Sequence, residues 1–252
     1  MMTFGEPLLI GLLMLAGVAC GFINTLAGGG SMLTLPLLIL LGLPADIANG
    51  TNRVAVVAQG VSGTWGFHRK GRVEWRNLGA LALPTVLGAL GGALLATQVP
   101  RLWLKPALLS TLVVVALVML LRPNWLPDES QGEPRSLRPS TWFGMFATGV
   151  YGGFVQAGVG FLLLGMLCGV LRYDLVRGNA LKLAVVLVFG TVSLLVFALA
   201  RQVCWSIGLL LACATVAGSQ IGVRTALTIR ATTLRWLLFV AVTVSCMGAW
   251  LR

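Results

Sequence analysis

Residues 183–199 read LAVVLVFGTVSLLVFAL, and residues 108–121 read LLSTLVVVALVMLL. Neither stretch alternates apolar and polar residues, as a strand of a membrane barrel would, so both stretches predict helices. A helix needs about 20 mainly apolar residues to cross a bilayer. Apolar stretches of this kind recur along the chain. The sequence therefore predicts an all-α, polytopic integral membrane protein.

Composition supports this prediction. The chain has 252 residues, of which 58% are hydrophobic and only 10% are charged, whereas a soluble domain carries about 25% charged residues. The net charge is +11, which on a soluble protein would suggest nucleic acid. Here Lys and Arg lie between apolar segments, where they set orientation in the membrane. We expect a lipid bilayer around the protein and no nucleic-acid partner.

The chain matches itself at an offset of 130 residues. Residues 27–30 (AGGG) align with residues 157–160 (AGVG), and Asn49 aligns with Asn179. Further matches fall on tryptophans and glycines, which coincide by chance less often than Leu or Ala. We therefore expect two repeated membrane halves, residues 1–121 and 140–252, joined by a polar loop at residues 122–139.

Each half contains five apolar segments, so the prediction is 8–10 membrane segments in total. In the first half they are 8–26, 31–43, 53–68, 77–99 and 104–121, and in the second they are 140–157, 161–171, 178–200, 203–229 and 232–251. The second segment of each half is short, about 16–20 Å as a helix. It is either half of a re-entrant hairpin or a full crossing helped by its neighbours.

The distribution of Lys and Arg favours inverted halves. The positive-inside rule places residues 69–76, 122–138, 172–177 and 230–235 in the cytoplasm and both termini outside. The expected location is the cell inner (plasma) membrane, crossed several times.

The first candidate site is the glycine-rich turn at residues 24–31 (NTLAGGGS) with its counterpart at residues 156–160 (QAGVG). Consecutive glycines leave backbone N–H groups accessible, and the helix that follows points its positive end at the same place. Close helix packing through small residues is the alternative explanation. The predicted anion-binding residues of these turns are Asn24, Thr25, Gly28, Gly29, Gly30 and Ser31, and Gln156, Gly158 and Gly160.

The second candidate site is residues 48–53 (ANGTNR) with its counterpart at residues 178–182 (GNALK). Each places an Asn near the start of the third segment and a cation three or four residues later, on one helix face. An ionisable residue inside a membrane segment marks a candidate functional site. An arginine can clamp a planar oxyanion through two parallel N–H bonds, whereas a lysine acts as a point charge. The alternative is that both cations snorkel to the interface. The predicted ligands are Thr51, Asn52, Arg53, Asn179 and Lys182.

Acidic residues are confined to predicted loops and segment edges. They are Glu6, Asp46, Glu74, Asp128, Glu129, Glu133 and Asp174. No carboxylate is therefore expected in mid-membrane to bind a cation. No motif for nucleotide binding, metal ligation or a catalytic triad is found, so we expect no metal, no cofactor and no enzymatic activity.

Several motifs of the first half resemble one known family. Residues 26–31 (LAGGGS), 41–44 (LGLP), 48–53 (ANGTNR) and 71–75 (GRVEW) are similar to the TauE/SafE family of sulfite and sulfonate exporters. The resemblance runs the whole chain, although Val159 interrupts the triple glycine in the second half. It implies a membrane carrier, often an exporter, for sulfur-containing or other organic anions.

These observations predict a transporter of a small anion such as sulfite or an organosulfonate, working by alternating access at the interface between the halves. Two alternatives remain. A metal-cation permease requires acidic, His or Cys ligands within the membrane. A membrane scaffold or assembly factor explains the repeats without any site, and neutral replacement of Arg53 or Lys182 would leave its function intact.

Overall fold

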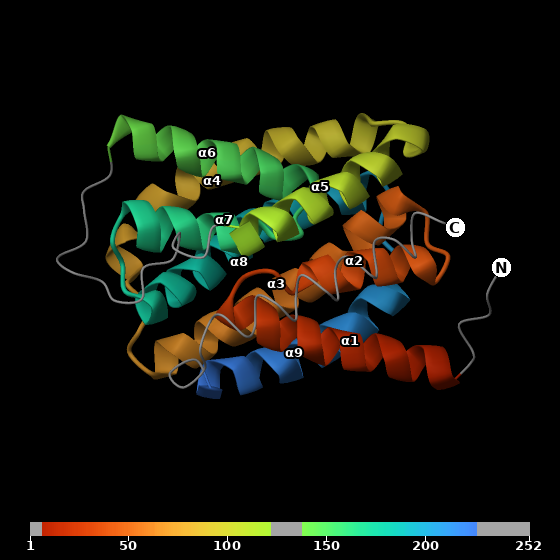
Figure 1. Ribbon diagram of the computed structural model, residues 1–252, viewed down its shortest axis with the longest axis horizontal. Helices are drawn as coiled ribbons and strands as arrows, with labels where there is room; N and C mark the ends of the chain where they lie inside the picture. Colours follow the sequence, from red (N-terminus) through yellow and green to blue (C-terminus); the bar gives the residue numbers. More distant parts are fainter. Residues whose placement is uncertain (1–6, 122–137, 226–252) are drawn as a thin grey trace.

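The computed structural model describes residues 7–121 and 138–225 of the chain, and within these ranges all regular structure is helical (Figure 1). The prediction of an all-α polytopic membrane protein is confirmed. The predicted segment 232–251 and most of the polar loop 122–139 lie outside the described residues. The helices are α1 Pro7–Leu26, α2 Ser31–Leu40, α3 Ala45–Arg69, α4 Trp75–Gln98, α5 Arg101–Leu121, α6 Pro139–Phe154, α7 Val159–Leu164, the π-helical η2 Gly165–Val170, α8 Leu175–Leu199 and α9 Trp205–Thr225.

Four of the described helices are long and apolar enough to cross a membrane: α4, α5 over residues 101–118, α8 and α9. Helix α3 has 25 residues but carries several polar side chains. It packs against α8 and α9, so much of its surface faces protein instead of lipid. The polar residues of α3 therefore lie inside the helical bundle.

Tryptophans lie close to the helix ends. The exposed indoles are those of Trp65, Trp75, Trp103, Trp142 and Trp205. Indole rings settle at the two membrane–water interfaces. Between them the surface is apolar, with side chains such as Leu83 and Leu195 more than half exposed.

Glycines bring two helix pairs into close contact. A Cβ atom built at Gly88 or Gly92 of α4 would lie 2.1 Å from a carbonyl oxygen of α6. A Cβ atom at Gly218 of α9 would lie 2.0 Å from the carbonyl oxygen of Val18 in α1. These distances leave room for hydrogen only, which is the packing that small residues provide between membrane helices. Helix α4 is thereby fastened to α6, and α9 to α1.

Two helical hairpins turn inside the bundle. Helices α1 and α2 are joined at residues 27–30, and α6 is joined to α7 and η2 at residues 155–158. Figure 1 shows α2 running back toward the end at which α1 begins. The short second segments are thus the returning arms of hairpins and not full crossings.

The third segments begin earlier than the sequence predicts. Helix α3 begins at Ala45 instead of residue 53, and α8 begins at Leu175 instead of residue 178. Asp174 caps α8 by accepting from the backbone N–H groups of Val176 and Arg177 at 3.1 and 2.9 Å. The predicted apolar segment left out the polar residues 49–52, although their spacing placed Asn49 and Arg53 on one helix face. In the structure they lie in the first turns of α3, buried by the surrounding protein.

Helices α3 and α8 run in opposite directions. Gly50, near the start of α3, lies against Gln202 after the end of α8, whereas Phe67, near the end of α3, packs with Ala180 near the start of α8. Positive φ angles recur at a separation of 130 residues. The pairs are Gly28 and Gly158, Gly42 and Arg172, and Gly71 and Arg201.

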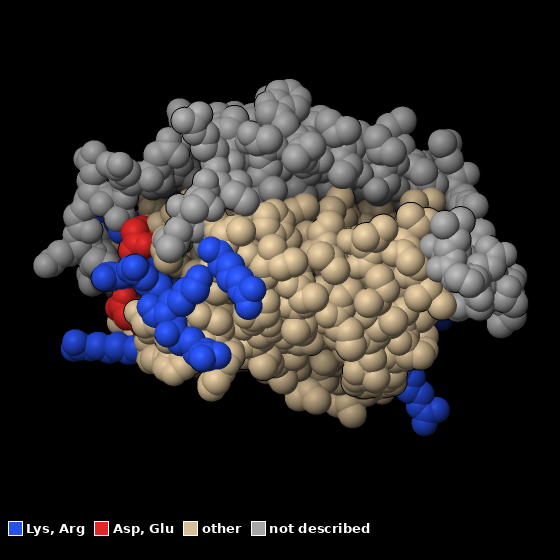
Figure 2. Space-filling view, turned by 90° about the horizontal axis from the view of Figure 1, so that it is seen from below, with Lys and Arg blue, Asp and Glu red and all other residues tan. Residues whose placement is uncertain are grey.

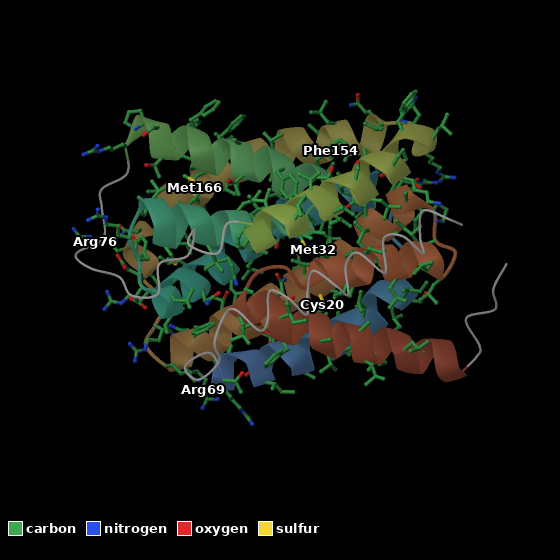
Figure 3. The ribbon with its side chains drawn as sticks, in the orientation of Figure 1. Cys20, Met32, Arg69, Arg76, Phe154 and Met166 are labelled. Atoms are coloured by element: carbon green, nitrogen blue, oxygen red, sulfur yellow. The ribbon has the colours of Figure 1, made fainter. Side chains whose placement is uncertain are left out.

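Exposed cations gather at one end of the molecule (Figure 2). Arg69 and Arg76 both lie at this end in Figure 3, which we call the basic end. It comprises the α3–α4 and η2–α8 connections, the start of α6 and the end of α9, and its cations are Arg69, Lys70, Arg72, Arg76, Arg138, Arg172, Arg177 and Arg224. Lys70 ties two of these elements together by donating to the carbonyl oxygen of Val223. Among the described residues, the opposite end has only Arg101, Lys105 and Arg201 exposed to any extent.

Candidate functional site

The two glycine turns meet in the middle of the bundle. Gly28 and Gly158 have φ angles of +81° and +80°, which residues with a Cβ atom rarely adopt. A Cβ atom at Gly28 would lie 2.2 Å from the carbonyl carbon of Gly160, and one at Gly158 would lie 2.1 Å from the Met32 methyl carbon. The structure thus brings together the two turns that the sequence singles out.

Backbone N–H groups are left free at the first turn. Within the described part of the chain, no acceptor is found for the N–H groups of Gly29, Gly30 and Ser31. These groups lie at the start of α2, where the helix dipole is positive. The turn therefore offers donors, as expected for a site that receives an anion.

Arg53 is completely buried at the end of α6. Its Nη1 donates to the carbonyl oxygen of Gly152 at 3.3 Å and to Oε1 of Gln156 at 2.6 Å, and its Nη2 donates to the carbonyl oxygens of Gly153 and Phe154. The last carbonyls of a helix have no partner within it and carry partial negative charge. Arg53 therefore caps the C-terminus of α6, and the Phe197 ring lies 4.2 Å from its guanidinium carbon.

This arrangement differs from the expected one, in which Arg53 clamps an oxyanion through two parallel N–H bonds. Both Nη groups of Arg53 already donate to protein oxygens, so a forked pair of bonds to an oxyanion is not free in this conformation. Snorkelling is excluded as well, because Arg53 and Lys182 are 0% and 1% exposed.

Lys182 makes the corresponding contact with α1. Its Nζ donates to the carbonyl oxygens of Asn24 and Thr25 at 2.7 and 3.2 Å and to Oδ1 of Asn179 at 2.7 Å. Asn24 and Thr25 lie in the last turn of α1. The cation of α8 thus caps the broken helix α1, just as the cation of α3 caps the broken helix α6.

Other predicted residues surround these two caps. Asn24 donates to Gln59 at 3.0 Å, Thr25 donates to Ser219 at 3.0 Å, and Asn52 accepts from Thr34 at 2.7 Å. Ser31 is buried beside them, and its carbonyl oxygen accepts from Thr34. All of them belong to one buried polar region.

Thr51 lies outside this region. Its hydroxyl accepts from the backbone N–H of Cys204, in the connection between α8 and α9. Its side chain leaves α3 on a different face from that of Arg53, because residues two positions apart point in different directions around a helix. Thr51 therefore stabilises the α8–α9 connection, which lies beside the start of α3.

Sequence reasoning missed several polar partners. Thr34, Gln59 and Ser219 lie outside the two repeated motifs, and the sequence therefore did not single them out. Asn49, which the repeat aligns with Asn179, donates to the carbonyl oxygen of Phe154 at 2.8 Å. An isolated amide or hydroxyl in a membrane segment is the only signal that would have found them.

The buried centre contains donors without acceptors. Arg53 Nε, Asn52 Nδ2 and Gln156 Nε2 have no hydrogen-bond partner in the described residues, and each side chain is at most 1% exposed. An unpaired buried donor is costly and calls for an explanation. A bound ligand that supplies hydrogen-bond acceptors would explain these unpaired donors.

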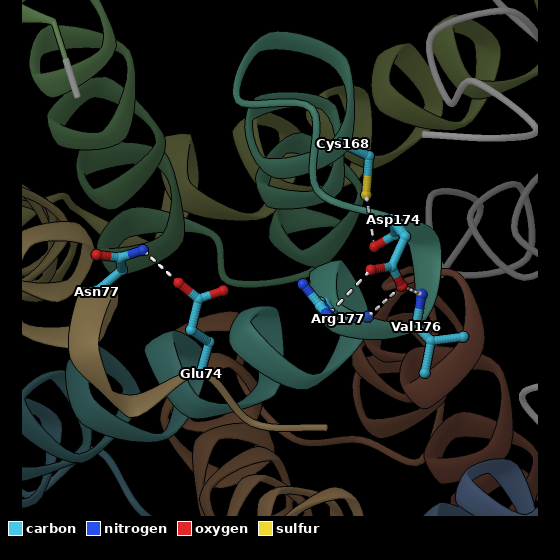
Figure 4. A network of polar contacts seen from close by, with 6 residues as sticks. All are labelled: Glu74, Asn77, Cys168, Asp174, Val176 and Arg177. Atoms are coloured by element: carbon cyan, nitrogen blue, oxygen red, sulfur yellow. Dashed lines mark hydrogen bonds and ion pairs between the residues drawn. The ribbon is translucent and has the colours of Figure 1, made fainter. Parts of the chain in front are cut away.

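No carboxylate pairs with either cap within residues 7–121 and 138–225. The ion pairs found there join Asp46 to Arg101 at 3.0 Å and Asp174 to Arg177 at 3.3 Å. Figure 4 shows the second of them at the basic end, near Glu74, which accepts from Asn77. The described residues also hold no cluster of three His, Cys, Asp or Glu side chains that could bind a metal. Among the described residues, Arg53 and Lys182 are therefore met by carbonyl and side-chain amide oxygens and by no carboxylate.

Taken together, the fold and the centre define a multi-pass helical membrane protein with broken helices and a buried cationic site, which is an arrangement typical of transporters. Residues 13–249 match the family described as sulfite exporter TauE/SafE, and the chain belongs to this family of membrane transporters.

Three relatives illustrate the similarity. A "Probable membrane transporter protein ORF9" of Sinorhizobium sp is 32% identical over 87% of this chain and 84% of its own. The "Probable membrane transporter protein YfcA" of Escherichia coli K12 is 28% identical over 87% and 81% of the two chains. A "Probable membrane transporter protein" of Haemophilus influenzae is 26% identical over 87% and 86%. No solved structure matches the chain.

Proposed function

We propose that the protein exports a small oxyanion, such as sulfite or an organosulfonate, across the bacterial inner membrane. The observation that carries this proposal is the pair of fully buried cations, Arg53 and Lys182, without a carboxylate partner in the described residues. A buried charge is costly unless it is compensated. An anion supplies the compensation that the described residues do not provide, and the family's description supports both the sulfur oxyanion and the direction of transport.

Unpaired donors support the same ligand class. Arg53 Nε, Asn52 Nδ2 and Gln156 Nε2 are all buried without acceptors. An oxyanion such as sulfite presents several oxygens, each with lone pairs. The free N–H groups of Gly29, Gly30 and Ser31 add donors at the positive end of α2.

The proposed mechanism is alternating access at the interface between inverted halves, residues 1–121 and 140–252. Three features support it: α3 and α8 are antiparallel, positive φ angles recur 130 residues apart, and each cap reaches from one half into the other. Sites between inverted repeats are reached from each side in turn as the repeats rock against each other. We place the basic end in the cytoplasm because positive loops remain inside.

Anion flux into proteoliposomes tests this proposal, with labelled sulfite and small sulfonates as probes. Wild type is expected to show saturable flux, and Arg53→Ala and Lys182→Ala are each expected to lower it at least tenfold. Arg76→Gln is the matched control, since it removes an equal charge from an exposed position at the basic end. Its flux is expected to stay within about twofold of wild type.

Three results would count against the proposal. Flux that survives both alanine substitutions would keep the carrier but move the site elsewhere. Equal loss in Arg76→Gln would assign the effect to overall charge. The absence of flux for every anion, in protein that elutes as a monodisperse peak, would favour a scaffold role.

A further inference from the structure

The two buried caps differ in one chemical respect. A guanidinium keeps its proton in proteins, whereas a lysine ammonium is able to release one in a buried site. Arg53 and Lys182 otherwise hold similar places, each at the C-terminus of a broken helix. We propose that Lys182 is the proton carrier of the transport cycle, so that one proton moves with each monovalent anion. This inference rests on the proposed anion transport.

The geometry around Lys182 suits a reversible change of charge. As an ammonium, its Nζ has three N–H groups, and three oxygens accept from it: those of Asn24, Thr25 and the Asn179 side chain. A neutral amine keeps two N–H donors and gains a lone pair, so one of the three contacts is lost. Because two of the acceptors belong to the last turn of α1, loss of the proton loosens the end of that helix.

Charge balance explains why proton and anion travel together. An empty centre with two cations leaves two uncompensated charges in a medium of low dielectric constant, which is unfavourable. Loss of the Lys182 proton removes one of them. Binding of an anion restores the advantage of the charged form, so the ammonium and the anion stabilise each other. When the anion leaves, the proton passes to water on the same side of the membrane.

The helices that pack against α8 offer no better carrier. Their titratable or charged side chains within the bundle are Cys20 of α1, Arg53 of α3, the half-buried Tyr151 of α6 and Cys168 of η2, the last of which interacts electrostatically with Lys182. The buried carboxylate Asp46 lies in the first turn of α3 and pairs with Arg101, and the other titratable residues, His68, Arg69 and Arg76, lie in the last turn of α3 or the first turn of α4. Carboxylates and imidazoles are the usual proton carriers in membrane transporters. Neither group is found in the buried centre of the described structure, so Lys182 remains.

Proton movement coupled to anion flux tests this role. Proteoliposomes with an internal pH indicator would be given methanesulfonate, which stays ionised and cannot carry a proton itself. Wild type is expected to move about one proton with each sulfonate and to be insensitive to an imposed membrane potential. Lys182→Arg keeps the charge but cannot release the proton. It is expected to move sulfonate without protons and to respond to the potential. The matched variant Lys105→Arg makes the same change outside the buried centre and is expected to keep the wild-type ratio of protons to sulfonate.

Sulfite serves as the second probe. Sulfite is able to carry a proton itself, so the comparison of wild type with Lys182→Arg shows which group carries the protons that move with it. Protons carried by sulfite persist in the variant, whereas protons carried by Lys182 do not. Persistence of proton movement with methanesulfonate in Lys182→Arg would overturn the inference, because that anion cannot carry the proton itself. If Lys182→Arg is not monodisperse, the test rests on the ratio of protons to methanesulfonate moved by wild type. A ratio near zero overturns the proposed role of Lys182.

Failure of the proposed function looks different. Anion flux without protons in wild type removes the proton-carrying role and leaves the carrier intact. No anion flux in wild type removes the carrier, and this inference with it.

Discussion

Gly28 and Gly160 touch backbone to backbone where the two broken hairpins meet, and a Cβ atom at Gly28 would lie 2.2 Å from the carbonyl carbon of Gly160. Backbone atoms cannot move aside as a flexible side chain can. The contact therefore sets how closely the two hairpins approach each other.

Gly28→Ala is expected to disrupt this contact. The substitution combines a positive φ, which costs roughly 1–2 kcal/mol for a residue with a Cβ atom, with the clash against Gly160. Gly42→Ala is the matched control, because Gly42 has a φ of +96° and nothing within 4 Å of its Cβ position. The temperature at which the detergent-solubilised protein loses its monodisperse peak should fall much further for Gly28→Ala. Equal losses would mean that backbone strain alone matters at residue 28.

Neighbouring glycines of α4 allow a second comparison. A Cβ atom at Gly92 would lie 2.1 Å from the carbonyl oxygen of Val150, whereas Gly91 has nothing within 4 Å. Gly92→Ala is expected to push α4 and α6 apart and to lower the melting temperature. Gly91→Ala should leave it unchanged or raise it slightly, since alanine favours a helix over glycine by up to about 1 kcal/mol. A loss of stability in Gly91→Ala would contradict the assigned face of α4.

Asn179→Asp tests the importance of the uncompensated charge. Oδ1 of Asn179 accepts from Lys182 at 2.7 Å, and aspartate keeps the same shape while adding a counter-charge. The protein should fold normally, yet anion flux should fall at least tenfold because the cation no longer needs the substrate. Gln98→Glu is the control, with the same change of chemistry at an exposed helix end. Wild-type flux in Asn179→Asp would show that the charge of Lys182 does not attract the anion.

Orientation in the membrane can be measured with introduced cysteines. Arg72→Cys lies at the basic end and Arg201→Cys at the opposite end, both at exposed positions. A membrane-impermeant maleimide should label Arg201→Cys in intact cells and Arg72→Cys only in inside-out vesicles. The parent protein corrects for Cys204 and Cys213, which are partly or fully exposed. The reverse pattern would place the basic end outside.

Local features of the chain were largely predictable. Apolar stretches located the helices, and the glycines of residues 28–30 located a turn, because both depend on neighbours in the sequence. The segment starts were wrong: residues 49–53 are polar, and only the surrounding helices α8 and α9 make a helix there favourable.

Long-range pairing was not predictable. Nothing near Arg53 in the sequence shows that its guanidinium meets the carbonyl oxygens of residues 152–154, about one hundred positions away. The sequence also left the course of residues 31–40 open, because a helix of 10 residues fits either a hairpin arm or a tilted crossing. Gln59 and Ser219 were not predicted because they lie outside the repeated motifs, and their partners Asn24 and Thr25 lie in another helix.

The caps also bear on how the protein is made. Helix α1 leaves the ribosome long before Lys182 does, so the carbonyl oxygens of Asn24 and Thr25 have no ammonium partner while the first half alone is in the membrane. Arg53, in turn, lacks its carbonyl partners until α6 has been synthesised. Neither half is able to complete its own broken helix, so a chain truncated after residue 121 should be held by the insertion machinery or degraded. Folding in the membrane is therefore complete only when both halves are present, because each half supplies the cation that caps a helix of the other.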